Sequence, residues 1–139
     1  MKKSNIRAAE AASSSDAMLK LERALALHRQ GEVCQAGALY RDILMLEPDN
    51  FNALHLLGAF ALQSGDIQAA YELITRAAAI APQLALVHLH RGVALQGLQR
   101  YGEALLSYRR ALRIDPGQVD ANFNEGLCLL LNGDLEAGW

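Results

Sequence analysis

Histidine and cysteine are the residue types in this chain that could bind a metal or act as catalytic base and nucleophile, and it has four of the first and two of the second. His88 and His90 are two residues apart, which puts them on different sides of a helix. His28 and His55 could approach each other, but no carboxylate or cysteine is placed beside them to complete a metal site. We therefore interpret the histidines as packing or ligand contacts and predict no metal and no cofactor.

The other residues of potential chemical interest do not form a catalytic pattern. Cys34 and Cys128 have no spacing typical of a metal site or a disulfide framework. Ser13, Ser14 and Ser15 lie near the start of the chain, where a serine cluster indicates a linker. The sequence has no phosphate-binding glycine loop, no HExxH motif and no nucleophile elbow. We predict that the protein is not an enzyme.

Composition indicates one ordinary soluble domain. The chain has 139 residues, of which 52% are hydrophobic, and a formal net charge of −2. This balance provides no general attraction for nucleic acid or an anionic membrane, and we interpret the local cluster of Arg109, Arg110 and Arg113 as a solvated helix face. The first 16 residues predict no secretory signal, and the sequence has no apolar run of about 18 residues that could span a bilayer. Together with two unpaired thiols, this predicts a cytoplasmic protein.

A period of 34 residues organises the chain. Two sets of residues share it: Pro48, Pro82 and Pro116, and Gly58, Gly92 and Gly126. A period of this length is typical of helical repeat proteins. It divides the chain into units 17–50, 51–84 and 85–118 and a partial unit 119–139, after an N-terminal segment 1–16 that we expect to be flexible.

Each unit contains two windows of helical periodicity separated by a short turn. Glycine occupies the turn in three units, at Gly31, Gly65 and Gly133. At this place a residue with positive φ can end the first helix without a Cβ clash. The third unit has Gln99 there, and we expect the nearby Gly97 and Gly102 to take up the bend.

Small residues recur in the middle of the helices. Gly58, Gly92 and Gly126 lie within the first helices, although a glycine inside a helix costs about 1 kcal/mol relative to alanine. The compensating gain that we expect is a close approach of the two helices of each pair. A larger side chain such as leucine at Gly92 should overpack that crossing.

These residues resemble the tetratricopeptide repeat (TPR) family. The family pattern of small, small, large, small and proline is met by Gly92, Ala104, Tyr108, Ala111 and Pro116 in the third unit, and by Gly58, Ala70, Ile74, Ala77 and Pro82 in the second. The first unit is looser, with Ala24 and Ile43 at two of these places. The resemblance implies an all-α fold: an α-solenoid, wound as a right-handed superhelix of antiparallel helix pairs, with three full units and a partial fourth.

The resemblance also implies that the first helices line a concave groove. Three rows of side chains would face it: Leu21, His55, Leu89 and Phe123; Leu25, Ala59, Val93 and Leu127; and His28, Leu62, Gln96 and Leu130. Nine of these twelve are apolar, which indicates a site for an amphipathic helix or an extended apolar segment of a protein partner. The N-terminal stretch before Ala17, or a second copy of the chain, could occupy the same surface instead.

One specialisation of the family is not expected here. Members that hold the acidic tails of chaperones use Lys, Asn and Arg at fixed groove positions to bind a carboxylate. Those positions hold Leu21, Leu25, Leu56, Leu86 and His90 in this sequence.

The C-terminal unit is expected to be incomplete, ending at Trp139 a short way into its second helix. Its first helix contains the run 127–131, the most apolar in the sequence, which predicts self-association through this end. Residues 131–139 look like the last repeat of bacterial TPR proteins that continue into a glycosyltransferase domain. Three functions follow: a protein-interaction scaffold, the N-terminal adaptor of a larger enzyme such as a bacterial glycosyltransferase, or a self-assembling structural array.

Overall fold

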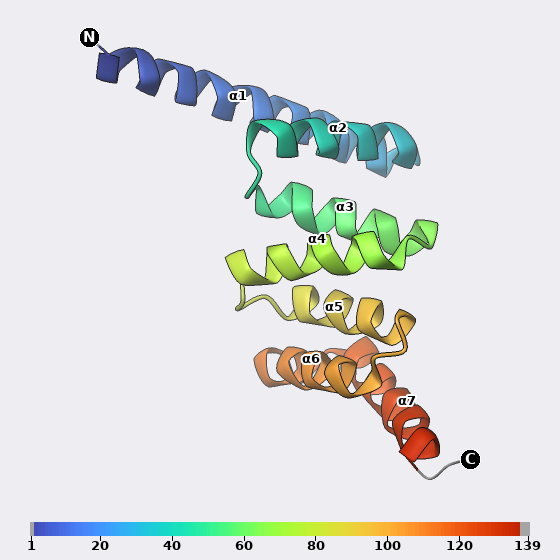
Figure 1. Ribbon diagram of the computed structural model, residues 1–139. Coiled ribbons are helices and arrows are strands. Elements are labelled where there is room, and N and C mark those ends of the chain that lie inside the picture. The colour runs from blue at the N-terminus through green and yellow to red at the C-terminus, as the bar shows by residue number, and fades with distance from the viewer. Residues whose placement is uncertain (1, 137–139) are drawn as a thin grey trace.

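The structure is a ladder of helices stacked in chain order (Figure 1). The computed structural model describes the backbone of residues 2–136 and the side chains of residues 15–118 and 120–133. Within residues 2–136 the backbone forms seven α-helices and no strand. They are α1 (Lys2–Arg29), α2 (Val33–Leu46), α3 (Phe51–Ser64), α4 (Ile67–Ile80), α5 (Ala85–Gly97), α6 (Tyr101–Ile114) and α7 (Val119–Glu136). The predicted all-α array of helix pairs is confirmed.

Each helix packs mainly against its neighbours in the chain, with additional contacts of α5 to α3 and α7. The core is therefore a seam along the stack that includes three clusters of buried residues. Its largest fully buried side chains include Tyr40, Ile43, Leu54, Ile74 and Tyr108. These residues recur at helical spacing, so one face of each helix provides apolar area to the seam.

The glycines inside the first helices allow the helix pairs to pack closely. A Cβ atom added at Gly58 would lie 2.6 Å from Cγ1 of Ile74, and one added at Gly92 would overlap the ring of Tyr108. The predicted close approach is thus confirmed in the second and third units. It is wrong for Gly126, where a Cβ would meet no atom within 4 Å among the described residues, because no later helix crosses α7 there.

The turns between paired helices share one backbone geometry. Gly31 and Gly65 have φ values of 85° and 84°, as predicted. Gln99 itself adopts φ 61°, so the expectation that Gly97 and Gly102 would take up the bend is wrong. The reason is that a hydrogen bond closes the turn at a fixed position: Asp66 N–H to Ala61 O and Arg100 N–H to Leu95 O, each 2.9 Å.

The two ends of the stack differ from the sequence-based expectation. α1 begins at Lys2, so the stretch before Ala17, expected to be flexible, has a helical backbone. α7 runs through Gly133 to Glu136 without the turn predicted at that glycine, since a helix tolerates an internal glycine at modest cost. Residues 137–139 of the expected second helix lie outside the described part. No helix in the described part combines the length and apolar character that crossing a bilayer requires.

Candidate functional site

The predicted groove residues lie on α1, α3, α5 and α7 and differ in how accessible they are. Eight are partly buried: Leu21, Leu25, His28, His55, Ala59, Leu62, Val93 and Gln96. Three on α7 are exposed, with 71% of Phe123, 37% of Leu127 and 67% of Leu130 accessible to solvent. The accessible apolar surface therefore increases toward the C-terminal end of the row.

Leu89 is the exception among the twelve. Only 4% of it is accessible, and it belongs to the core cluster that contains Leu95 and Tyr108. An acidic substitution at Leu89 would therefore disrupt the core as well as any groove. A test of groove binding needs one of its more accessible neighbours.

Three of the predicted groove residues come together around one hollow. Leu62 of α3 and Val93 and Gln96 of α5 line a cavity of about 370 Å³, which α7 closes with Asn124 and Leu131. Sequence reasoning missed the last two, although Leu131 ends the apolar run that it singled out. A second hollow of about 280 Å³ is lined by Leu25, His28 and Arg29 of α1 and Leu56 of α3.

The amide of Gln96 is fixed at the edge of the larger hollow. Its Oε1 accepts a hydrogen bond from the Tyr108 hydroxyl at 2.7 Å and a weaker one from Cys128 Sγ at 3.4 Å. Burial raises the pKa of Tyr108 strongly and raises that of the Cys128 thiol as well. Both groups are therefore neutral donors at ordinary pH, and Gln96 can turn its amide nitrogen toward the hollow.

Two histidines form a direct pair between α3 and α5. Nε2 of His55 and Nδ1 of His90 are 2.8 Å apart, so one ring donates its N–H to the other. Burial, and secondarily the charge of His90, lowers the pKa of His55 to about 4, and burial lowers the pKa of His90. Both rings are neutral at pH 7. The predicted approach of His28 to His55 is wrong, because the helices bring His90 to that position instead.

Among the side chains that the structure describes, the histidine pair has no third metal ligand. Among the residues with described side chains, no group of three or more His, Cys, Asp or Glu could hold a metal ion. The two facing ring nitrogens already share one proton between them. Cys34 is exposed and Cys128 is buried, and neither is in a disulfide. This arrangement suits recognition of an apolar or weakly polar ligand.

Comparison with known proteins agrees with this architecture. The family pattern described as tetratricopeptide repeat matches residues 85–118, the third unit. The TPR domain of Arabidopsis OM64 superposes with a TM-score of 0.78 at 24% identity, covering 84% of this chain and 96% of that one. Residues 85–118 of this chain therefore match a tetratricopeptide repeat, and the stack of helices has the fold of tetratricopeptide repeat domains. The resemblance drawn from the 34-residue pattern is confirmed.

Two further matches are to parts of longer proteins. A Thermobaculum terrenum O-GlcNAc transferase superposes with a TM-score of 0.75 at 27% identity, over 84% of this chain and 22% of that one. The cellulose synthase 2 operon protein C of Komagataeibacter xylinus is 40% identical over 68 residues, which are 49% of this chain and 5% of that protein. The chain thus spans a small fraction of the curated relative that it matches.

Proposed function

We propose that this TPR chain is a non-catalytic scaffold that binds a protein or peptide partner on the face formed by its first helices. The observation that carries the proposal is the apolar hollow between α3, α5 and α7, where Leu62 and Val93 are partly accessible at predicted groove positions. Burial of apolar area there would contribute about 25 cal/mol per Å² before the costs of association.

The partner segment that fits best is an amphipathic helix or an extended apolar stretch. The hollows at α1–α3 and α3–α5–α7 lie along the same row of first helices, and the neutral His55–His90 pair joins α3 and α5 in that row. A carboxylate-bearing tail is a poor match. The positions where other family members hold a cationic clamp carry leucines such as Leu86, and His90, whose Nδ1 already contacts His55.

The proposal is tested with peptides selected from a random library against the whole chain. Leu62→Glu places a charge in the hollow and should weaken binding of the selected peptides at least tenfold by calorimetry, because the carboxylate must be desolvated. Met45→Glu is the matched control, since Met45 is an exposed apolar residue on α2 and lines neither hollow. Peptides that bind Leu62→Glu as tightly as wild type would contradict the groove.

A second candidate function is an adaptor within a larger enzyme such as a bacterial glycosyltransferase. The observation in its favour is the likeness to a fraction of an O-GlcNAc transferase and of a cellulose synthase operon protein. Here the same groove would bind a substrate protein or another part of the enzyme. The coding sequence after Trp139 decides this: a following glycosyltransferase domain supports the adaptor, and a stop codon contradicts it.

A third candidate is self-association through α7. Phe123, Leu127 and Leu130 expose apolar area on this helix, and Leu129 adds to it. Light scattering should show a mass that rises with protein concentration and that falls to the monomer value in Leu130→Glu. A mass that stays at the monomer value at all concentrations would contradict self-association.

A cytoplasmic location also belongs to the proposal. It is supported by the free thiols of Cys34 and Cys128.

A further inference from the structure

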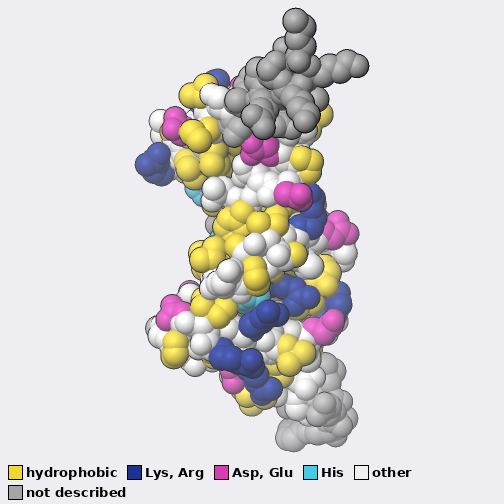
Figure 2. Space-filling model, turned by 90° about the vertical axis from the view of Figure 1, so that its left-hand side faces the viewer, with side chains coloured by type: hydrophobic (Ala, Val, Ile, Leu, Met, Phe, Trp, Pro, Cys, Tyr) yellow, Lys and Arg dark blue, Asp and Glu magenta, His cyan; other side chains and the backbone are white. Residues whose placement is uncertain are grey.

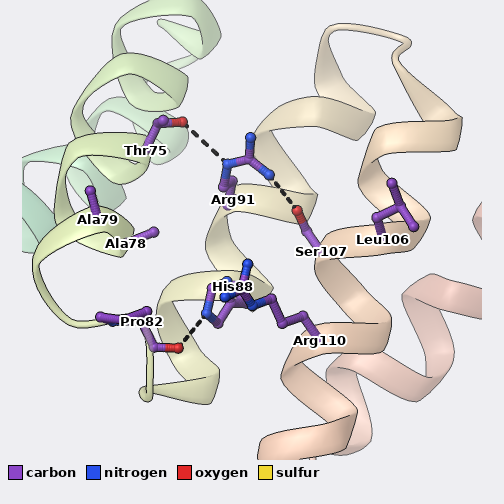
Figure 3. A pocket seen from close by; sticks show the side chains of 9 residues that line it. All are labelled: Thr75, Ala78, Ala79, Pro82, His88, Arg91, Leu106, Ser107 and Arg110. Carbon is purple, nitrogen blue, oxygen red and sulfur yellow. Dashed lines mark hydrogen bonds between the residues drawn. The ribbon is translucent and has the colours of Figure 1, made fainter.

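A third hollow, the α4–α6 pocket, opens between α4, α5 and α6, and its chemistry differs from that of the groove. It has a volume of about 460 Å³. Five polar side chains line it: Thr75, His88, Arg91, Ser107 and Arg110 (Figure 3). None of its lining residues is acidic. Figure 2 shows positively charged side chains gathered around a small histidine patch in the middle of the stack.

This pocket is separate from the candidate groove. His88 and Arg91 are three residues apart and share one face of α5. The groove positions Val93 and Gln96, also three apart, share another face of that helix. The α4–α6 pocket and the α3–α5–α7 hollow of the groove have no lining residue in common. A ligand in one therefore leaves the other open.

Arg91 is held in place by neutral groups. Its Nε donates to Thr75 Oγ1 at 3.3 Å and its Nη1 to Ser107 Oγ at 2.9 Å, so the side chain bridges α4 and α6 (Figure 3). Among the described side chains, no carboxylate lies within 4.0 Å of its guanidinium. The two bonds use only part of the guanidinium's donor set, and the other N–H groups can bind an anion.

The fold itself does not require a cation at this place. In the 34-residue register, Arg91 corresponds to Leu57 and His88 to Leu54, and both leucines are buried in the second repeat. The third repeat thus replaces an apolar pair with a polar one and opens a hollow beside it. Only 3% of the His88 surface is accessible to solvent, and its Nε2 donates a hydrogen bond to the carbonyl of Pro82 at 2.7 Å.

We propose that this pocket binds a phosphate group. The planar guanidinium of Arg91 suits two phosphate oxygens, and the hydroxyls of Thr75 and Ser107, which accept from Arg91, can each donate their own O–H. Arg110 at the exposed rim supplies a second positive charge, which matches the near-dianionic phosphate monoester. The volume is many times the roughly 30 Å³ share of one water, so the organic group that carries the phosphate can enter beside Leu106 and Ala78.

The experiment titrates the whole chain with inorganic phosphate at constant ionic strength, followed by amide chemical shifts. Wild type should show saturable shifts that centre on α4–α6, and chloride should not reproduce them. Arg110→Ala should weaken binding at least fivefold. Arg109→Ala is the matched control: Arg109 is the adjacent exposed arginine, lies outside the pocket and should leave binding unchanged.

Arg91→Leu tests the pocket from within. It restores the leucine that the second repeat carries, so the fold should persist, as the thermal melt checks, while phosphate binding is lost. If Arg91→Leu unfolds, Arg110→Ala alone decides. Equal binding by wild type and Arg110→Ala, or shifts spread evenly over all arginines, would overturn the site.

A phosphoserine peptide forms the second arm and identifies the source of the phosphate. Tighter binding of the peptide than of inorganic phosphate assigns the site to a phosphorylated protein segment. Equal binding assigns it to a small phosphate compound. The groove variant Leu62→Glu should bind phosphate as wild type does, so failure of the groove proposal and failure of this one can be told apart.

Discussion

The first and third repeats place a tyrosine at the same point in the 34-residue register but give it different surroundings. In the third, the Tyr108 hydroxyl donates to Gln96 Oε1 at 2.7 Å. In the first, Tyr40 and His28 occupy the corresponding positions, and neither the Tyr40 hydroxyl nor His28 Nδ1 has a partner among the described residues. The 34-residue period therefore specifies the size of the buried side chain. Whether its hydroxyl finds a hydrogen-bond partner depends on which residue lies next to it in that repeat.

The same two repeats differ at the helix crossing, where the largest effect is expected. Gly92 lies against the Tyr108 ring, while the first repeat has the buried Ala24 at this position. Gly92→Leu should lower the free energy of unfolding by about 1–3 kcal/mol, measured by urea denaturation, because the helices must separate. Gly126→Leu is the control, since its surroundings are open. Equal losses in the two variants would show that crowding against the Tyr108 ring is not the cause of the loss.

The contacts between successive repeats should differ in how their stability depends on pH. His55 and His90 stand in register with Leu21 and Leu56 at the preceding junction. Because the folded pKa of His55 is about 4, the unfolded chain binds more protons below pH 6.5. Stability should be complete above pH 6.5 and should fall as pH drops toward 4.

The measurement is the midpoint of urea unfolding at pH 7 and pH 5. The expected loss is on the order of 2 kcal/mol, because each unit of pKa difference between the folded and unfolded states corresponds to about 1.4 kcal/mol. The double variant His55→Leu, His90→Leu copies the preceding junction and should remove most of this difference. A loss of the same size in the double variant would assign the pH effect to other groups.

The two tyrosines allow a direct test of the opening comparison. Tyr108→Phe leaves Gln96 Oε1 with only the thiol donor and should destabilise the protein by about 1 kcal/mol in chemical denaturation. Tyr40→Phe removes a hydroxyl that has no partner in the described structure, and should change stability by less than about 0.5 kcal/mol or increase it. The reverse order of the two effects would contradict the comparison.

The smallest effect concerns the turns. Gln99 holds a positive φ where the first repeat has Gly31. Gln99→Gly should raise the free energy of unfolding by about 0.5–1 kcal/mol, because the Cβ strain is released at some entropic cost. Gly31→Gln should lower it by about 1 kcal/mol, although nothing lies within 4 Å of the added Cβ. If neither substitution changes the stability measured in a thermal melt, backbone strain does not distinguish the two turns.

The sequence predicted the helix pairs, the helix crossings at Gly58 and Gly92 and the turns at Gly31 and Gly65, because each follows from residue type repeated at a fixed interval. It failed where the outcome depends on packing between repeats. Leu89 and Phe123 share one register position, yet the first is in the core and the second is 71% exposed. The position within the 34-residue period therefore does not predict whether neighbouring helices bury the side chain.

The histidine pairing failed for a related reason. His55 and His90 are 35 residues apart, one more than the period, so the contact crosses from one register position to the next. A periodic pattern aligns equivalent positions but does not give the offset between neighbouring first helices. The α4–α6 pocket was also missed, since Arg110 was interpreted only as part of a solvated face and Arg91 was not singled out.

Because helices contact almost only their chain neighbours, the molecule resembles a stack whose height is set by the number of layers. A duplicated 34-residue unit inserted after Ile80 would lengthen the stack by one layer and leave both ends chemically unaltered. Such an insertion would increase the distance between the groove's two hollows by one repeat. Only a longer partner segment could then occupy both hollows.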